Sequence, residues 1–135
     1  MSVIFKDFSK EVQEKINALG VAWLEEASGE VEAQTKRNTK VDTGKTKSSW
    51  EHKVYDEKLE AEVGSRYKNA LWEELGTGIY ALNGDGRKDV PWFYKDAEGK
   101  GHLTKGKKPR RAFHNAYQSL KNKIIRECKR KFKEI

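Results

Sequence analysis

The chain has 135 residues, which suits one domain spanning residues 1–135, and only 36% of them are apolar against 36% that are charged, so its core must be thin. Fourteen aromatic residues, four of them Trp, argue against a disordered chain and predict buried interfaces. A single cysteine, Cys128, excludes an internal disulfide, which fits a protein of a reducing cytoplasm. No apolar run approaches the roughly 20 residues of a membrane span and the N-terminus lacks a signal-peptide pattern, so we expect a soluble protein with no membrane partner.

A long amphipathic helix is predicted first. Its apolar residues recur every three or four positions, at Phe5, Phe8, Val12, Ile16, Leu19, Trp23, Ala27 and Val31. The helix should begin near Asp7 or Ser9 and end near Arg37 or Asn38, which gives a length of about 45 Å. Gly20 lies in its middle and predicts a kink or a close contact. Since so long a helix exceeds the span of a small globule, part of it should lie against another subunit.

A reversal and a hairpin should follow this helix. The reversal is predicted at Val41, Asp42, Thr43 and Gly44, because Asp and Thr side chains bond the backbone locally and glycine tolerates left-handed angles. Alternating apolar residues then predict strands over 48–55 and 59–65, with a turn at 56–58 between them. This segment therefore works as a hinge from helix to strand and carries no chemistry of its own.

The middle of the chain predicts a short helix and a second hairpin. The helix should cover residues 67–75 and end at Gly76, which suits a C-cap. The stretch 76–89 is rich in Gly, Asn and Asp and predicts a mobile loop. Strands over 90–95 and 101–104 should form the second hairpin.

A second long amphipathic helix, strongly basic, is predicted from Phe113 to Phe132 after a basic loop over 105–111. Residues 100–135 hold 13 Lys/Arg and two acids, a net charge of +11, whereas residues 1–99 have a net charge of −4. This excess can meet DNA phosphates, an RNA or an acidic protein surface, or it can be a solvated helix face. The candidate DNA or acidic-partner contacts are Lys107, Lys108, Arg110, Arg111, Lys121, Arg126, Lys129 and Arg130.

The order helix, hairpin, short helix, hairpin, helix predicts an α+β fold. The long N-terminal and C-terminal helices should pack on one face of a small antiparallel sheet of hairpins.

The residue pattern does not indicate catalysis. Gly44-Lys45-Thr46 matches the end of a phosphate-binding loop, but Thr39 stands where that loop needs a glycine. The three histidines lack the spacing of a zinc site. Glu73 and Glu74 are neighbours on a helix, so they do not share a face and are interpreted as structural. We therefore expect no enzyme, no metal, no cofactor and no small-molecule substrate.

Three segments, taken in order, carry a resemblance. They are VDTG at 41–44, ELGTG at the end of 63–78, and the basic loop 107–111 leading to Phe113. Together they resemble the small neck proteins of tailed bacteriophages, the gene-ten-product-like family of lambdoid-type phages, variously called tail-completion, minor capsid or head–tail connector proteins. The resemblance spans about residues 5–130. Its marker turns are Val41, Asp42, Thr43, Gly44, Glu74, Gly76, Thr77 and Gly78.

The resemblance implies a structural virion protein that joins head and tail at the neck of a phage or prophage. It implies assembly in the host cytoplasm, a homo-oligomeric ring, the head connector and tail proteins as partners, and non-specific contact with DNA. An alternative is a basic nucleic-acid-binding protein with a regulatory role. A small nuclease or hydrolase would require an acidic cluster to converge in the fold.

Overall fold

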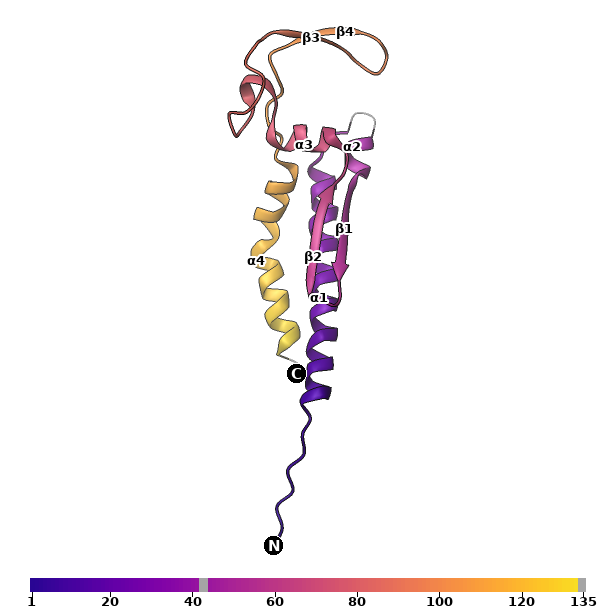
Figure 1. The fold of residues 1–135 in the computed structure, drawn as a ribbon, viewed down its shortest axis with the longest axis vertical. Coiled ribbons are helices and arrows are strands. Elements are labelled where there is room, and N and C mark those ends of the chain that lie inside the picture. Colours follow the sequence, from indigo (N-terminus) through magenta and orange to yellow (C-terminus); the bar gives the residue numbers. More distant parts are fainter. Residues whose placement is uncertain (42–43, 134–135) are drawn as a thin grey trace.

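The computed structural model describes residues 1–41 and 44–133, and these form an elongated molecule (Figure 1). Its elements in chain order are α1 (Ser9–Asn38), α2 (Lys45–Ser48), β1 (Trp50–Tyr55), β2 (Glu60–Ser65), α3 (Lys68–Leu75), the 3-10 helix η1 (Gly78–Tyr80), β3 (Trp92–Lys95), β4 (Gly101–Thr104) and α4 (Ala112–Phe132). The predicted α+β class is confirmed.

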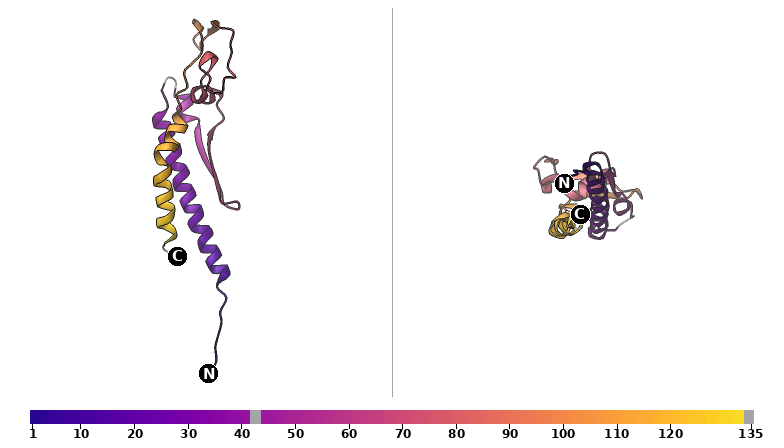
Figure 2. Two further views of the ribbon diagram at one scale, coloured as in Figure 1. Left: turned by 90° about the vertical axis from the view of Figure 1, so that its left-hand side faces the viewer. Right: turned by 90° about the horizontal axis from the view of Figure 1, so that it is seen from below.

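The long helix α1 lies between α4 on one side and the β1–β2 hairpin on the other (Figures 1 and 2). α4 runs antiparallel to α1. The Trp23 indole donates to the Ile124 carbonyl at 3.0 Å, and Lys123 pairs with Glu30 at 3.3 Å. The C-terminal helix therefore packs on α1 rather than on a sheet.

The proximal hairpin, which we define as residues 50–65, packs along α1. Its two strands pair antiparallel, from Trp50 opposite Ser65 to Tyr55 opposite Glu60. Leu59 was expected in the second strand but lies in the turn with φ of 51°. Its side chain covers Gly20, where an added Cβ would lie 3.2 Å from Leu59 Cδ2. The close contact predicted at Gly20 is thus confirmed, and it explains why Leu59 leaves the strand pattern.

The predicted start of α1 is confirmed, because the helix begins at Ser9, whose N–H donates to Asp7 Oδ1 at 2.9 Å; Phe5 and Phe8 of the apolar pattern precede it. The boundary predicted for the strand after α1 was wrong. After α1, the residues from Lys45 to Ser48 form α2 instead of entering the strand. Gly44, at φ of 83°, starts this extra turn, and its carbonyl accepts from Ser48 N at 3.0 Å.

The distal hairpin, residues 92–104, pairs β3 with β4 and forms a separate two-stranded sheet across the far end of the molecule (Figure 1). The two hairpins therefore do not join into one sheet. β3 begins at Trp92 rather than at position 90, since Pro91 has no N–H for a sheet. The loop predicted over 76–89 contains η1.

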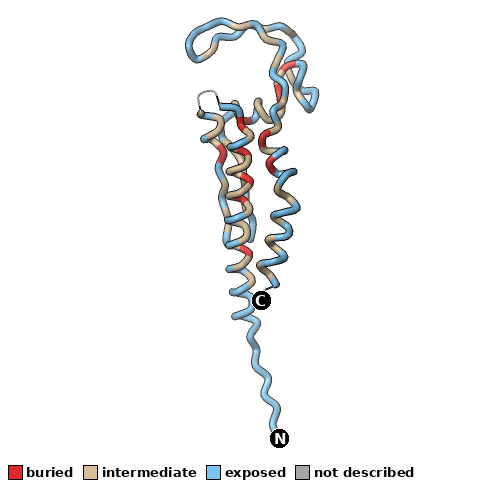
Figure 3. The backbone as a smooth tube through the Cα atoms, turned by 180° about the vertical axis from the view of Figure 1, so that it is seen from behind, coloured by how far each residue is buried: buried red, intermediate tan, exposed pale blue. Residues whose placement is uncertain are grey.

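The core is thin and lies near the end where α1, α3 and α4 meet (Figure 3). Among the described residues, the buried hydrophobic side chains are Val31, Trp50, Ala70, Ala112 and Ala116. Residues 1–15 are exposed throughout. No helix in the described part of the chain is long and apolar enough to cross a membrane.

Candidate functional site

Two of the three segments that carry the resemblance, the ELGTG segment and the basic loop, meet at one place, which we call the junction. It consists of Asn38 at the end of α1, the stretch from Glu73 to Gly78, and the stretch from Lys105 to Phe113. Residues more than 30 positions apart in the chain lie side by side there, so the junction is where the motifs acquire a physical role.

Glu74 of the ELGTG segment caps the last helix. Its two carboxylate oxygens accept hydrogen bonds from the backbone N–H groups of Phe113 and His114, each at 2.9 Å. Arg111 Nε lies 3.8 Å from the same carboxylate, whose side chain is only 13% exposed. A carboxylate at a helix N-terminus satisfies free N–H groups and complements the helix dipole. Glu74 is therefore structural, as its sequence position indicated.

The Gly-Thr-Gly turn clasps the basic loop. Thr77 N donates to the Lys107 carbonyl at 2.9 Å, Lys107 N donates to Thr77 Oγ1 at 2.9 Å, and Ile79 N donates to the Lys105 carbonyl at 3.1 Å. A Cβ at Gly78, where φ is 61°, would lie 2.1 Å from the Lys105 carbonyl oxygen. Only glycine fits this crossing, so the turn holds both chain segments that lead to the distal hairpin.

Two further contacts tie α1 to the junction. Asn38 Nδ2 donates to the Ala112 carbonyl at 3.1 Å, and Arg110 Nε donates to the Asn38 carbonyl at 3.2 Å. Arg110 N also donates to the Glu73 carbonyl at 2.6 Å. The ends of α1, α3 and α4 are thereby fixed to one another.

The VDTG segment lies partly outside this network. Val41 is exposed, and Gly44 caps α2 in the left-handed conformation expected for it. Asp42 and Thr43 lie outside the described residues. α2 itself is joined to α3, because Asn69 Nδ2 donates to Thr46 Oγ1 at 2.8 Å.

The eight basic residues predicted to contact DNA or an acidic partner divide into two groups. Lys107 pairs with Glu73, Arg111 with Glu74, and Arg130 with Glu127 at 2.5 Å. Arg110 is held at the junction, and Lys108 Nζ lies 5.8 Å from the Tyr80 ring centroid. Within the described residues, no ion pair involves the remaining three, which are Lys121, Arg126 and Lys129. These three cations stay available to a partner.

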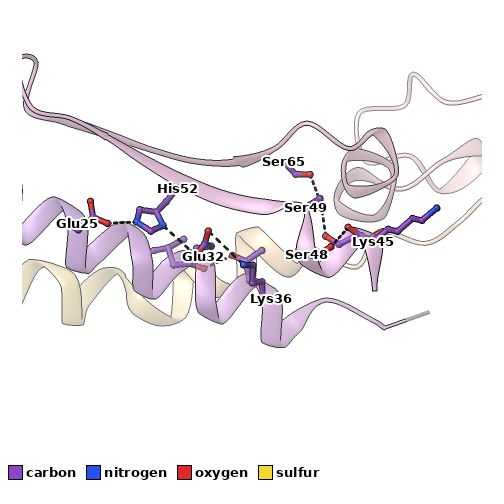
Figure 4. A network of polar contacts seen from close by, with 11 residues as sticks. Glu25, Glu32, Lys36, Lys45, Ser48, Ser49, His52 and Ser65 are labelled. Carbon is purple, nitrogen blue, oxygen red and sulfur yellow. Dashed lines mark hydrogen bonds and ion pairs between the residues drawn. The ribbon is translucent and has the colours of Figure 1, made fainter. Parts of the chain in front are cut away.

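A polar network on α1 joins the proximal hairpin to the helix (Figure 4). His52 Nε2 lies 2.6 Å from Glu25 Oε1, and His52 Nδ1 lies 3.5 Å from Glu32 Oε2. The pKa of His52 is raised, because the ring hydrogen-bonds to Glu25 and the charges of both carboxylates favour the imidazolium, against the opposing effect of burial. Lys36 in turn lies 3.9 Å from Glu32. The arrangement is a clamp between strand and helix.

Sequence reasoning missed this clamp. Glu25 and Glu32 are seven residues apart, hence two turns apart on one helix face, and that spacing was the available signal. In residues 1–41 and 44–133, no group of three His, Cys, Asp or Glu side chains could hold a metal ion.

The comparisons with known proteins agree with the motifs. The profile of a family described as "Bacteriophage HK97-gp10, putative tail-component" matches residues 5–80, from before α1 to the end of η1. No curated protein and no solved structure gives a significant match. The family match covers more than half of the chain and includes both VDTG and ELGTG. The chain belongs to the HK97-gp10-like family and is a tail or head–tail component of a tailed bacteriophage.

Proposed function

We propose that the chain is a non-enzymatic subunit of the phage neck, a head–tail connector or tail-completion protein that works by protein–protein assembly. Its family supports this proposal, and so does the use of its motif residues, which hold the fold together at the junction. Residues 1–135 would act as one domain, made in the host cytoplasm and retained in the neck as a minor component of the virion.

The observation that carries the proposal is the apolar surface at the N-terminal end. α1 extends beyond the end of α4, and an extended segment precedes it (Figures 1 and 2). The exposed apolar side chains there are Val3, Ile4, Phe5, Phe8 and Val12. A chain with so thin a core gains stability from covering such residues, and exposed apolar patches are typical of interaction sites.

A second apolar surface lies at the opposite end, on α3 and the segment after it. Its exposed members are Leu71, Trp72, Ile79, Tyr80 and Leu82. Two different surfaces at opposite ends of an elongated subunit suit heterologous contacts between copies, which close into rings when the rotation allows it. We propose a homo-oligomeric ring that also contacts the head connector and the tail.

Electron microscopy of a phage lacking this gene tests the role. Full heads and separate tails are expected, with normal particles restored by the gene supplied in trans. Normal virions without the protein would overturn the proposal.

A double variant sharpens the test. Phe5→Ser with Phe8→Ser removes two exposed aromatic rings that precede α1, so the fold should be unchanged and head–tail joining should be lost. The matched control replaces Phe93, an exposed ring of the distal hairpin, by Ser. An equal loss of head–tail joining in both variants would contradict the role proposed for the N-terminal apolar surface.

A further inference from the structure

The side of α4 that faces away from α1 carries an unusual row of residues. They are spaced by three or four positions, and we call them the outer stripe: Asn115, Gln118, Asn122, Arg126, Lys129 and Lys133. At about 100° per residue they fall within roughly 40° of one line on the helix, and the row is about 27 Å long. All six are exposed.

Every residue of the outer stripe can donate a hydrogen bond from its side chain. Three members are cations and three are side-chain amides, and none is acidic or apolar. Two exposed apolar residues of α4 lie outside it: Ile125 borders the stripe, and Tyr117 lies about 140° from its centre.

The acidic residues near α4 form ion pairs with other cations of this helix. Glu30 pairs with Lys123, and Glu26 pairs with Lys131 at 3.0 Å. Glu127, the acid within α4, pairs with Arg130. In the part of the chain that the structure describes, no ion pair involves Arg126, Lys129 or Lys133. These pairs compensate the charges of Lys123, Arg130 and Lys131, whereas the cations of the outer stripe have no such partner among the described residues.

This chemistry fits phosphates better than a protein surface. Cores of protein interfaces are enriched in aromatic and apolar anchors and depleted in Lys, and the outer stripe has no such anchor. Phosphodiester oxygens only accept hydrogen bonds, and Arg, Lys, Asn and Gln are the side chains that contact them. A straight row of donors without aromatic rings or a base-reading motif contacts a backbone and reads no sequence.

We infer that the outer stripe binds the phosphate backbone of double-stranded DNA without sequence preference. The preference of the outer stripe for phosphates follows from its charges and their spacing alone. The choice of double-stranded DNA as the occupant rests on the proposed function, because the genome crosses the joint between head and tail. The inference also narrows the eight predicted contacts to Arg126 and Lys129 and adds Lys133.

Binding of the full-length protein to a 30-base-pair duplex of arbitrary sequence, followed by fluorescence anisotropy at several salt concentrations, tests the inference. The variant Arg126→Gln with Lys129→Gln and Lys133→Gln should bind at least about tenfold more weakly at low salt. Its plot of log affinity against log salt should be flatter by about 3, since each phosphate contact contributes about 0.9 to the slope. Duplexes of different sequence should bind alike.

The matched control removes the same charge elsewhere. Lys95→Gln with Lys100→Gln and Lys105→Gln alters three exposed lysines in or next to the distal hairpin, at the other end of the molecule from the last turns of α4 (Figure 1), and should keep the affinity and the slope. An equal loss in both variants would make net charge the cause and overturn the inference. Undiminished DNA binding by the α4 variant would also overturn the inference, and so would binding of poly-glutamate in preference to DNA.

The two experiments distinguish failure of the DNA-binding inference from failure of the proposed neck role. A protein that does not bind DNA but whose deletion leaves heads and tails apart removes only this inference. Salt-dependent DNA binding by a protein whose deletion leaves virions normal removes the neck role instead.

Discussion

The two hairpins are similar antiparallel pairs, yet they have opposite relations to the rest of the molecule. The proximal hairpin packs along α1, whereas the strands of the distal hairpin pack chiefly on each other across the far end (Figure 1). In the first, Trp50 is 7% exposed and stacks on Phe113, with ring centroids 5.8 Å apart. In the second, the cross-strand partners Phe93 and Leu103 are 61% and 72% exposed.

An isolated two-stranded hairpin is marginally stable in water, so the distal hairpin depends on hydrogen bonds and ring stacking among its own residues. Asp96 Oδ1 accepts hydrogen bonds from Glu98 N and Lys100 N, and its other oxygen lies 2.7 Å from His102 Nε2. Tyr94 stacks on His102. An alternating pattern therefore predicts a hairpin, but the surrounding helices decide whether its apolar face becomes core or surface.

Replacing Trp50 by Ala should give the largest effect. Loss of a large buried aromatic side chain leaves a cavity beside Phe113 and costs about 3–5 kcal/mol, a large share of the stability of an ordinary domain. Phe93→Ala, the matched change in the distal hairpin, should cost at most about 0.5 kcal/mol. Urea unfolding followed by circular dichroism measures both. Similar costs in the two variants would remove the distinction between the hairpins.

A glycine pair tests how the distal hairpin is anchored. Gly78→Ala adds both left-handed strain and a clash with the Lys105 carbonyl, so we expect a loss of about 3 kcal/mol. Gly84→Ala has a similar φ of 70° but nothing within 4 Å of the new Cβ, and should cost about 1–2 kcal/mol. Thermal unfolding compares them. If Gly84→Ala proved as costly as Gly78→Ala, backbone strain alone would explain both, and the clasp at Thr77 and Lys107 would contribute little.

Much of this fold follows from local sequence signals. The periodicity of apolar residues placed α1 and α4 within a few residues of their observed ends, and turn chemistry located both hairpins and the Gly76 cap. These features depend on neighbours three or four positions apart. α2 was missed, because one helical turn between a glycine and a strand has no periodicity to detect.

The contacts between distant residues did not follow from the sequence. Glu74 reaches Phe113, 39 positions away, and no local pattern pairs them. The turn at Leu59 likewise depends on a glycine of α1 that packs against it. The count of charges predicted a basic end of the chain, but it did not show that Lys123 and Lys131 pair with carboxylates of α1 while the cations of the outer stripe lie on the opposite side of α4.

The clamp at His52 predicts a pH dependence confined to the proximal hairpin. Since its pKa is raised in the folded protein, the protonated ring adds stability that is fully present below the unfolded pKa of about 6.5 and is lost as pH rises through the folded value. Ion pairs this close to solvent contribute on the order of 0.5 kcal/mol. Melting temperatures of the wild type and His52→Gln, measured from pH 5.5 to 9, should therefore converge at the alkaline end.

His114→Gln is the control for this titration, because His114 is an exposed histidine at the start of α4. It should leave the difference between acid and alkaline stability unchanged. A wild-type profile that is flat from pH 5.5 to 9, or one that His114→Gln flattens equally, would show that Glu25 and Glu32 do not hold a charged His52.

The smallest effect is expected at the turn of the distal hairpin. Asp96→Ala removes the acceptor of Glu98 N and Lys100 N and the partner of His102, so amide exchange at those two backbone groups should accelerate. The pKa of Asp96 is lowered by its hydrogen bonds with His102 and Lys100, so in the wild type the same loosening should appear only as pH falls below the usual range of a carboxyl group. The melting temperature should not change, because the packing of α1 and α4 does not depend on this turn.

Amide exchange measured by nuclear magnetic resonance distinguishes this local loosening from a loss of overall stability, with Asp85→Ala in the preceding loop as the control. A clear fall in melting temperature for Asp96→Ala would mean that the distal hairpin supports α1 and α4 after all, and that the two hairpins differ in exposure but not in their coupling to the core.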